Sequence, residues 1–291
     1  MSKAVIGVIG GSGLYSLAGF TPTREVAVDS PFGQPSDALR FGRFGATEVV
    51  FLARHGRGHR FSPSTINYRA NIDALKRAGV TDIIAISACG SYKRELYPGL
   101  FVLADQFIDR TFRRETSFFG TGCVAHVPFA HPTSDVLRKR VAAAAAAEGI
   151  AALQGGTYVC MEGPQFSTYA ESVNYQRLGA SVIGMTAATE AKLAREAEIA
   201  YALIAMVTDF DCWHDEYGPV DVASVMKVMR DNGEKANRLV ARMLADYPAE
   251  REPCPLSDRA LEGAIMTAPE VRDAELMKKL EAVAGRALRS A

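Results

Sequence analysis

The sequence YALIAMVTDFDCWH, residues 201–214, decides the fold class, because an uninterrupted apolar run leads directly into two carboxylates. Almost every side chain in residues 201–207 is apolar, which predicts a strand that is covered on both faces. Asp209 and Asp211 follow where this strand ends, and alternation along an extended chain would point both to the same side. Ligands bind at the carboxyl ends of strands in open α/β sheets, so we interpret the two acids as ligand-facing. The alternative is a pair of solvated loop acids.

Apolar runs of the same kind recur along the chain, with helical patterns between several of them. The strand-like runs are residues 5–9, 49–53, 83–87, 101–104, 157–161, 182–185 and 201–207. The helix-like segments are residues 64–78, 134–148, 190–198 and 222–244, the second with Thr133 or Ser134 as a candidate N-cap. This order predicts an α/β fold with a largely parallel or mixed central sheet flanked by helices.

The chain has 291 residues with 48% hydrophobic content, enough to bury a substantial core. One composition break, YPAEREPCPLSD at residues 247–258, carries three prolines and several charges and indicates a surface linker. We therefore expect an α/β domain over residues 1–246. Residues 247–291 would form a linker and a C-terminal helical extension, packed on the same domain or on a neighbouring subunit.

Charge and cysteine content exclude several classes of protein. The 33 basic residues balance the 33 acidic ones, which gives no electrostatic case for nucleic acid or an anionic membrane surface. No run approaches the ~20 apolar residues of a membrane span, and the N-terminus has no signal-peptide pattern. The five cysteines are scattered and form no zinc-ligand pattern. These features predict a cytoplasmic protein without a structural metal.

Hydrogen-bond donors follow three of the predicted strands. The first run ends in Gly10-Gly11-Ser12-Gly13, whose glycines and hydroxyl suit an anion. A dinucleotide-binding site would continue into a long helix, but here an irregular segment through Pro22 follows. The loop RHGRGHR at residues 54–60 brings three arginines and two histidines together after a strand. The run SACGS at residues 87–91 adds two hydroxyls. We expect these strand ends to bind a phosphate or sulfate; a solvated basic turn is the alternative for residues 54–60.

The stretch MEGPQFST at residues 161–168 follows another strand and combines an acid, a turn, an aromatic ring and hydroxyls. Phe166 would stack on a flat heterocycle or, alternatively, fill the core. We interpret Glu171 and Glu190 as helix-surface or capping residues. His126 and His131 have no acid or nucleophile beside them in sequence, and the absence of a GxSxG motif gives no support for a serine hydrolase.

Taken together, the motifs resemble those of the 5′-methylthioadenosine phosphorylases, the trimeric branch of the purine nucleoside phosphorylase family. The resemblance covers residues 6–245 and is carried by GGSGLY, FLARHGRGH, SPSTINYRANI, SACGS, DQFIDRT, TYVCMEGPQFST, GMTAATEAKLAREAE and TDFDCWH. It implies a single α/β domain around a mixed, partly barrel-like sheet. It also implies a homotrimer with active sites near the subunit interfaces.

The resemblance assigns roles to individual residues. Phosphate would be held by Ser12, Arg54, His55, Ser87, the backbone at Ala88 and Thr186. The ribose would lie along Met185. The purine would lie beside Phe166 and Ser167, with the turn Asp209-Phe210-Asp211 presenting its acids to N7 and the 6-amino edge. The methylthio group would enter an apolar pocket formed by Val222, Val225 and Met226, with His126 contributed by the neighbouring subunit. Ser12 and Ser87 stand where many relatives carry threonine and Met226 where leucine is common; both hydroxyl donors are kept.

The implied activity is phosphorolysis of S-methyl-5′-thioadenosine, with a small nucleoside and inorganic phosphate as substrates and no cofactor or metal. Asp209 would share a proton with N7 of the leaving purine, because burial can raise the pKa of a carboxyl at such a position. Asp211 would accept a hydrogen bond from the 6-amino group. The acids thus favour adenine over hypoxanthine.

Three alternatives remain. A phosphorylase of 6-oxopurine nucleosides or of methylthioinosine uses the same chemistry, although the apolar residues 222–226 disfavour an ordinary 5′-hydroxyl. A nucleosidase that uses water would leave Arg54 and His55 without a purpose. A non-catalytic nucleotide-binding module would bind the ligand without turnover.

Overall fold

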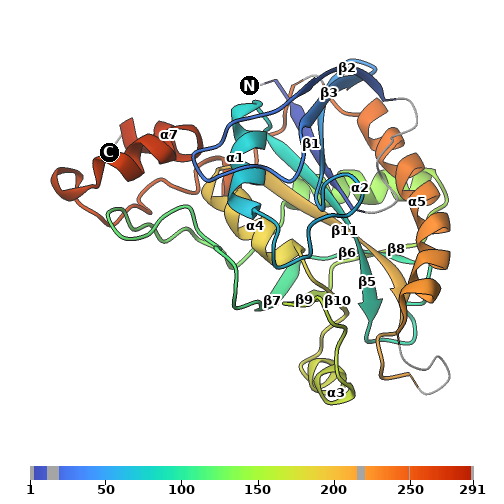
Figure 1. The fold of residues 1–291 in the computed structure, drawn as a ribbon. Helices are drawn as coiled ribbons and strands as arrows, with labels where there is room; N and C mark the ends of the chain where they lie inside the picture. Colours follow the sequence, from blue (N-terminus) through green and yellow to red (C-terminus); the bar gives the residue numbers. More distant parts are fainter. Residues whose placement is uncertain (1–2, 12–19, 215–219, 249, 290–291) are drawn as a thin grey trace.

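The strand that leads to the two carboxylates, β11 (Ala200–Asp209), belongs to an 11-stranded mixed sheet. The computed structural model describes residues 3–11, 20–214, 220–248 and 250–289 (Figure 1). Within these parts of the chain, β11 pairs in parallel with β5 (Asp82–Ser91) along its length and antiparallel with β6 (Phe101–Leu103). The predicted α/β fold with a mixed sheet is confirmed.

The remaining strands of the described residues are β1 (Val5–Gly10), β2 (Thr21–Val26), β3 (Leu39–Phe44), β4 (Thr47–Ala53), β7 (Gln106–Arg110), β8 (Ala152–Gln154), β9 (Thr157–Met161) and β10 (Val182–Gly184). The helices are α1 (Tyr68–Arg77), α2 (Asp135–Ala147), α3 (Tyr169–Arg177), α4 (Ala187–Glu196), α5 (Val222–Ala245), α6 (Pro255–Asp258) and α7 (Ala274–Arg289), with a 3-10 turn η1 (Pro269–Val271).

The sheet branches at β5. Its main path runs β2-β3-β4-β1-β5-β10-β9-β7, while β11 and then β6 and β8 extend from the same β5. Strands β4, β1, β5 and β11 are parallel, so their carboxyl ends lie at one edge. Strand β10 pairs antiparallel with the last residues of β5, beyond the stretch that pairs with β1. The end of β10 therefore reaches the same edge from the opposite direction.

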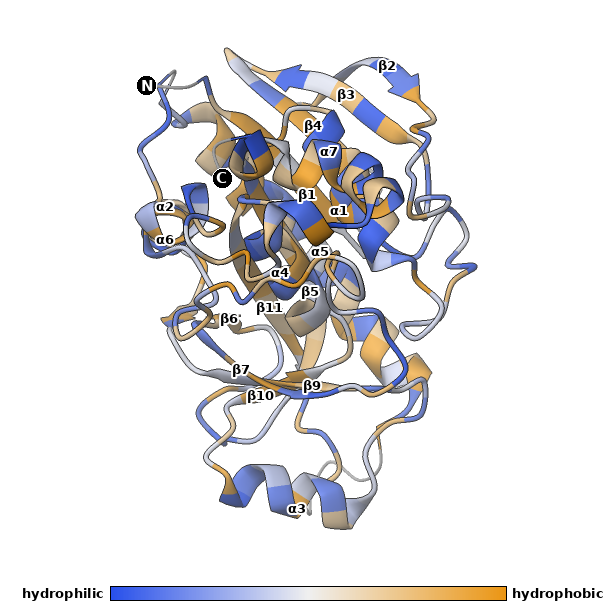
Figure 2. Cartoon of the chain, turned by 90° about the vertical axis from the view of Figure 1, so that its left-hand side faces the viewer, coloured by the Kyte–Doolittle hydropathy of each residue, from blue (hydrophilic) through white to orange (hydrophobic). Residues whose placement is uncertain are grey.

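Helices cover both faces of the central strands, as the continuous apolar runs predict. Alternate residues of β11 enter two separate cores: Leu203 packs in the cluster that includes α1, α4 and α7, and Ile204 packs in the cluster that includes α2 and α5. Figure 1 shows α1 and α4 on one side of the sheet and α5 on the other. Figure 2 shows the hydrophobic residues concentrated on the inner strands and on the helix faces toward them.

Local capping explains where several helices begin. Asn67 accepts a hydrogen bond from the Ala70 N–H at the start of α1, and Ser134 caps α2 as predicted. At α3, Thr168 and Glu171 form a reciprocal capping box, so the prediction that Glu171 is a cap or surface residue is confirmed. Asp221 caps α5 by accepting from two backbone N–H groups.

Several elements differ from the sequence predictions. The segment predicted as irregular around Pro22 contains β2, which pairs antiparallel with β3 at the edge of the sheet. An edge strand tolerates a proline and charged residues because one of its sides has no neighbouring strand to hydrogen-bond. Its sequence, TPTREV, therefore shows no apolar pattern. The short strands β7 and β8 and the helix α3 were also not predicted. They are brief and partly exposed, so their hydrophobic periodicity is weak.

The C-terminal segment returns to the main body of the same chain. Leu280 and Val283 of α7 lie in the same hydrophobic cluster as α1 and α4, and α7 contacts α1 directly. Arg286 also forms an ion pair with Glu198 at the end of α4. No helix in the described ranges combines the length and the hydropathy needed to cross a membrane.

Candidate active site

A cavity of about 630 Å³ opens where the ends of β4, β5, β10 and β11 meet the first turns of α5. It brings together most of the residues that the sequence singled out. Those that line it are Arg54, His55, Ser87, Ala88, Phe166, Met185, Thr186, Asp209, Asp211, Val222, Val225 and Met226.

Four other predicted site residues are not among the described residues that line this cavity. Phe210 is buried and packs edge-on against Trp213, with ring centroids 6.0 Å apart. Ser167 turns its hydroxyl toward the Met161 sulfur at 3.7 Å. His126 is exposed on a segment held by Ala264. Ser12 lies outside the described residues.

Arg54 forms the deepest part of one end of the cavity, and it is held by Glu190. Its side chain is 1% exposed, and Nε and Nη2 donate to the two carboxylate oxygens of Glu190 at 2.5 and 3.1 Å. Nη1 donates to the Ile86 carbonyl at 2.9 Å. These bonds use three of the five guanidinium N–H groups, so two remain for a ligand as far as the described residues show.

The prediction for Glu190 as a helix-surface or capping residue is wrong. Glu190 is 2% exposed and accepts from Tyr201 at 3.0 Å as well as from Arg54. A buried carboxylate is stable only when it is paired and hydrogen-bonded, and Arg54 supplies both conditions. The alanines at positions 187, 188 and 191 of the same helix are the signal that could have indicated its burial.

His55 presents a single nitrogen to the cavity. Its Nδ1 lies 2.8 Å from the Phe61 carbonyl, and because a carbonyl only accepts, Nδ1 carries a proton. Burial and the positive charge of Arg54 lower the pKa of His55 to about 4, so the ring is neutral near pH 7 and Nε2 is an acceptor. His59, which also lines the cavity, stacks on this ring with centroids 4.1 Å apart.

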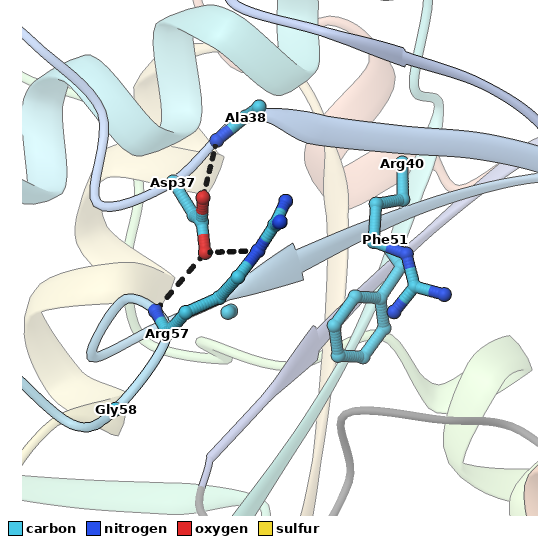
Figure 3. Close-up of a pocket in the computed structure, with 7 residues that line it drawn as sticks. Asp37, Ala38, Arg40, Phe51, Arg57 and Gly58 are labelled. Carbon is cyan, nitrogen blue, oxygen red and sulfur yellow. Dashed lines mark hydrogen bonds and ion pairs between the residues drawn. The ribbon is translucent and has the colours of Figure 1, made fainter.

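The arginines of the 54–60 loop do not all face one ligand. Arg57 lies in a second, smaller cavity of about 220 Å³, where Asp37 accepts from its backbone N–H at 3.0 Å and faces its Nε at 3.3 Å (Figure 3). Arg57 also pairs with Glu25. The interpretation of a solvated basic turn therefore describes Arg57, whereas Arg54, His55, His59 and Arg60 border the main cavity.

The N-terminus of α4 adds an anion-binding feature beside Arg54. Thr186 occupies the N-cap position, yet its side chain makes no capping hydrogen bond. Its hydroxyl is buried without a hydrogen-bond partner among the described residues. An unpartnered hydroxyl at the positive end of a helix favours a negatively charged ligand. Ser87 places a second hydroxyl at the same end of the cavity.

The two carboxylates occupy the opposite end. Asp209 Oδ1 accepts the Asp211 N–H at 2.8 Å, and its Oδ2 lies 2.6 Å from the Thr208 hydroxyl. Thr208 also contacts the Cys89 carbonyl at 3.1 Å. Burial raises the pKa of Asp209, although the hydrogen bonds from Thr208 and from the Asp211 N–H lower it.

Asp211 reaches the cavity by a turn, not by strand alternation as predicted. β11 ends at Asp209, and Asp211 has a positive φ of 49°. Asp211 is 4% exposed, and its carboxylate Oδ2 has no hydrogen-bond partner among the described residues. A buried acceptor oxygen that borders a cavity calls for a donor from the ligand.

Close approach at glycines shapes the middle of the cavity. A Cβ at Gly90 would lie 2.7 Å from Asp209 Oδ1, so the carboxylate fits only above a glycine. Likewise a Cβ at Gly163, where φ is +67°, would lie 2.5 Å from the Met185 sulfur. Phe166, at 43% exposure, lines the cavity and does not fill the core.

An apolar wall of the cavity lies at the start of α5. Val222 is 67% exposed and Met226 is 51% exposed, while Met229 forms a buried floor beneath them. The cavity thus offers anion donors at one end, carboxylates at the other and an apolar wall between them. This arrangement suits two ligands, one an anion and the other a partly apolar molecule with hydrogen-bond donors.

The chain is similar to known proteins over nearly its whole length. The family model described as "Phosphorylase superfamily" matches residues 5–245. The chain therefore belongs to the phosphorylase superfamily, which confirms the family resemblance seen in the sequence. It is 63% identical to S-methyl-5′-thioadenosine phosphorylase of Bradyrhizobium diazoefficiens over 99% of this chain and 100% of that protein. It is 55% identical to the protein of the same name from Cereibacter sphaeroides, over 99% of each chain.

Solved structures show the same fold. A methylthioadenosine phosphorylase from an Antarctic soil metagenomic library superposes with a TM-score of 0.90 at 42% identity, covering 97% of this chain and 99% of that one. The methylthioadenosine phosphorylase from Schistosoma mansoni in complex with adenine gives a TM-score of 0.80 at 38% identity, covering 84% and 91%.

Proposed function

We propose that this protein catalyses the reversible phosphorolysis of S-methyl-5′-thioadenosine to adenine and S-methyl-5-thio-α-D-ribose 1-phosphate. It is a pentosyltransferase that uses inorganic phosphate as a co-substrate and needs no cofactor. The observation that carries this function is the two-ended cavity, with Arg54 and Thr186 at the anion end and Asp209 and Asp211 at the other. The names of the relatives at 63% and 55% identity support the choice of nucleoside.

Phosphate is the attacking group in this reaction. We assign its binding to the two remaining N–H groups of Arg54, the Thr186 and Ser87 hydroxyls and the backbone at Ala88, with His55 Nε2 accepting the proton of a hydrogen phosphate. Ser12, which lies outside the described residues, belongs to the same proposed set. The sugar develops positive charge as the glycosidic bond breaks, and the bound anion stabilises that charge electrostatically.

The leaving purine needs a proton or a strong hydrogen bond at N7. Asp209 is the proposed donor, since burial raises its pKa. Asp211 is the proposed acceptor for the 6-amino group, through the carboxylate oxygen that lacks a partner in the described chain. A 6-oxo base presents an acceptor at that position in place of the 6-amino donor, which favours adenine over hypoxanthine.

The sugar and its 5′-substituent would occupy the space between. We assign the ribose to Met185 and the purine face to Phe166, with Ser167 and Phe210 behind the base. The methylthio group would contact Val222, Val225 and Met226. The exposure of Val222 and Met226 supports a homotrimer in which a neighbouring subunit covers this end and contributes His126. Five free cysteines support a cytoplasmic location.

Product analysis tests the proposed function. Purified protein is incubated with S-methyl-5′-thioadenosine, with and without phosphate, and the products are followed by chromatography and phosphorus NMR. We expect adenine and a sugar 1-phosphate in equal amounts, only when phosphate is present. Release of adenine with free methylthioribose and no phosphate requirement would identify a nucleosidase instead.

A further inference from the structure

A second buried arginine, Arg114, lies behind the cavity without lining it. It follows β7, and its side chain is 1% exposed. Its guanidinium packs over the Tyr68 ring, with Cζ 5.3 Å from the centroid. Its sequence position carries no sign of a role, because it stands in a loop between an exposed Phe112 and the polar residues that follow.

Every N–H group of Arg114 is engaged within the protein. Nε donates to the Glu162 carboxylate at 3.2 Å, and Nη2 donates to the Glu162 carbonyl at 2.7 Å and contacts the Met161 carbonyl at 3.5 Å. Nη1 donates to the Met185 carbonyl and lies 3.2 Å from the Tyr68 hydroxyl and 3.4 Å from the Thr189 hydroxyl. Five N–H groups therefore meet six acceptors, and none is left for a ligand. Arg54, by contrast, keeps two as far as the described part of the chain shows.

The backbone acceptors of Arg114 belong to the ends of two strands beside the cavity. β9 ends at Met161, and Glu162 leads from it into Gly163, against which the Met185 sulfur packs. The Met185 carbonyl belongs to the same planar peptide as the Thr186 N–H, so fixing the carbonyl fixes the orientation of that whole peptide. Thr189 lies one turn further along α4.

Glu162 anchors Arg114 from the other side. Its carboxylate is 6% exposed and accepts from the Ser64 hydroxyl and from the backbone N–H groups of Phe112 and Arg113. Although burial raises the pKa of Glu162, these hydrogen bonds and the charge of Arg114 outweigh it and lower the pKa to about 2. The Arg114 and Glu162 pair is therefore charged and fully hydrogen-bonded, which is the condition under which a buried ion pair holds one geometry.

We propose that Arg114 is a positioning residue for the reaction: it joins the ends of β9 and β10 and thereby sets the Met185-Thr186 peptide between the two halves of the substrate site. Met185 would contact the sugar and Thr186 the phosphate, so this inference rests on the proposed function. Displacement of that one peptide disturbs both substrates and their alignment together.

Arg114→Lys tests the proposal, because lysine keeps the charge but does not reach both strand ends with a planar fork. The matched control is Arg195→Lys. Arg195 is also buried, lies on the same helix as Thr189, donates to the carbonyls of Pro128 and His131 at 2.5 Å each, and packs over the Phe129 ring, yet it does not border the cavity. Melting temperatures and the kinetic constants for both substrates are measured for each variant.

For Arg114→Lys we expect kcat to fall by about 10²-fold, the order of effect of a small misplacement of reacting groups. KM for phosphate and KM for the nucleoside should each rise by about tenfold, the effect of roughly one lost hydrogen bond. Arg195→Lys should keep wild-type kinetic constants even if its melting temperature falls by as much as that of Arg114→Lys. Glu162→Gln, which preserves shape, should shift the same three constants by a smaller factor.

Wild-type kinetic constants in Arg114→Lys or, if that variant does not fold, in Glu162→Gln would overturn the proposal. An equal kinetic loss in Arg195→Lys would also overturn it, because the effect would then follow from lost stability alone. A wild-type protein that releases adenine without phosphate would instead contradict the proposed function, and this result is visible in the same assay.

Discussion

The backbone N–H of Asp211 donates to Oδ1 of Asp209 across 2.8 Å, so the two acids at the end of β11 form one local unit. The same turn gives Asp211 its positive φ and leaves one of its carboxylate oxygens without a partner in the described chain. Asp209, in contrast, has contacts at both oxygens and a pKa raised by burial. The two acids therefore have different environments, which suits one for proton donation and the other for acceptance.

Asp209→Asn should lower kcat for S-methyl-5′-thioadenosine by roughly 10²–10⁴-fold, the usual contribution of a general acid. The amide keeps the size of the side chain but has no acidic proton to share with N7. Steady-state rates with the methylthio derivatives of adenosine and inosine measure both the rate and the base preference, with exposed Asp231→Asn on α5 as a control. A variant that keeps the wild-type rate and preference would show that Asp209 does not hold the catalytic proton.

Arg54→Met should destabilise the protein by about 3–5 kcal/mol, because it leaves the Glu190 carboxylate buried and unpaired. Lys3→Met removes an exposed ion pair with Glu48 and should change the free energy of unfolding by less than about 1 kcal/mol. Denaturant unfolding of both variants gives the comparison. Similar small losses in both would mean that the Arg54 and Glu190 pair is not the buried support that its geometry indicates.

Met226→Gln should weaken the preference for a methylthio group over a 5′-hydroxyl. A polar group in place of an apolar contact of this size changes discrimination by about 1–3 kcal/mol, or roughly 10–200-fold. The measurement is the ratio of kcat/KM for S-methyl-5′-thioadenosine to that for adenosine. An unchanged ratio would place the 5′-substituent away from the first turns of α5.

Glu196 should make stability depend on pH. Burial raises the pKa of this carboxyl to about 7, despite hydrogen bonds from the Phe118 N–H and the Ser117 hydroxyl that lower it. The folded protein then holds a proton that the unfolded chain releases near pH 4.5. The contribution of Glu196 to the free energy of unfolding is therefore full below pH 4.5, and it is lost as the pH rises to about 7. This loss is of the order of 3 kcal/mol.

His55 contributes to the pH dependence with the opposite sign, because its lowered pKa reduces stability as the pH falls below about 6.5. The comparison of wild type with Glu196→Gln separates the contribution of Glu196 from that of His55. Unfolding free energies between pH 4.5 and 7.5 should fall more steeply with pH in the wild type than in the variant. Glu115→Gln, at an exposed carboxyl, is the control. Parallel curves for wild type and Glu196→Gln would exclude a proton held by Glu196.

The sequence predicts the centre of this fold well because the central strands are covered on both faces. Residues 201–207 fall within β11 and residues 83–87 within β5, since an uninterrupted apolar run has few other ways to be buried. The edge hairpin of β2 and β3 gives no such run, because Pro22, Arg24 and Glu25 face solvent or a single neighbour.

The site was predictable where a residue carries its own signal and not where its role depends on a distant partner. Arg54 follows an apolar strand and could be identified directly. Glu190 is 136 positions away from it, and nothing local shows that the two meet. Arg114 and Glu162 are 48 positions apart and raise the same difficulty. A buried ion pair becomes visible only when the fold brings both charges together.

The most direct test of the central claim is the initial rate of purine release from S-methyl-5′-thioadenosine and from methylthioinosine, each with and without phosphate. We predict that release requires phosphate and that the 6-amino nucleoside is cleaved with a higher kcat/KM than the 6-oxo nucleoside. Phosphate-independent release, or a higher kcat/KM for methylthioinosine, would contradict the account.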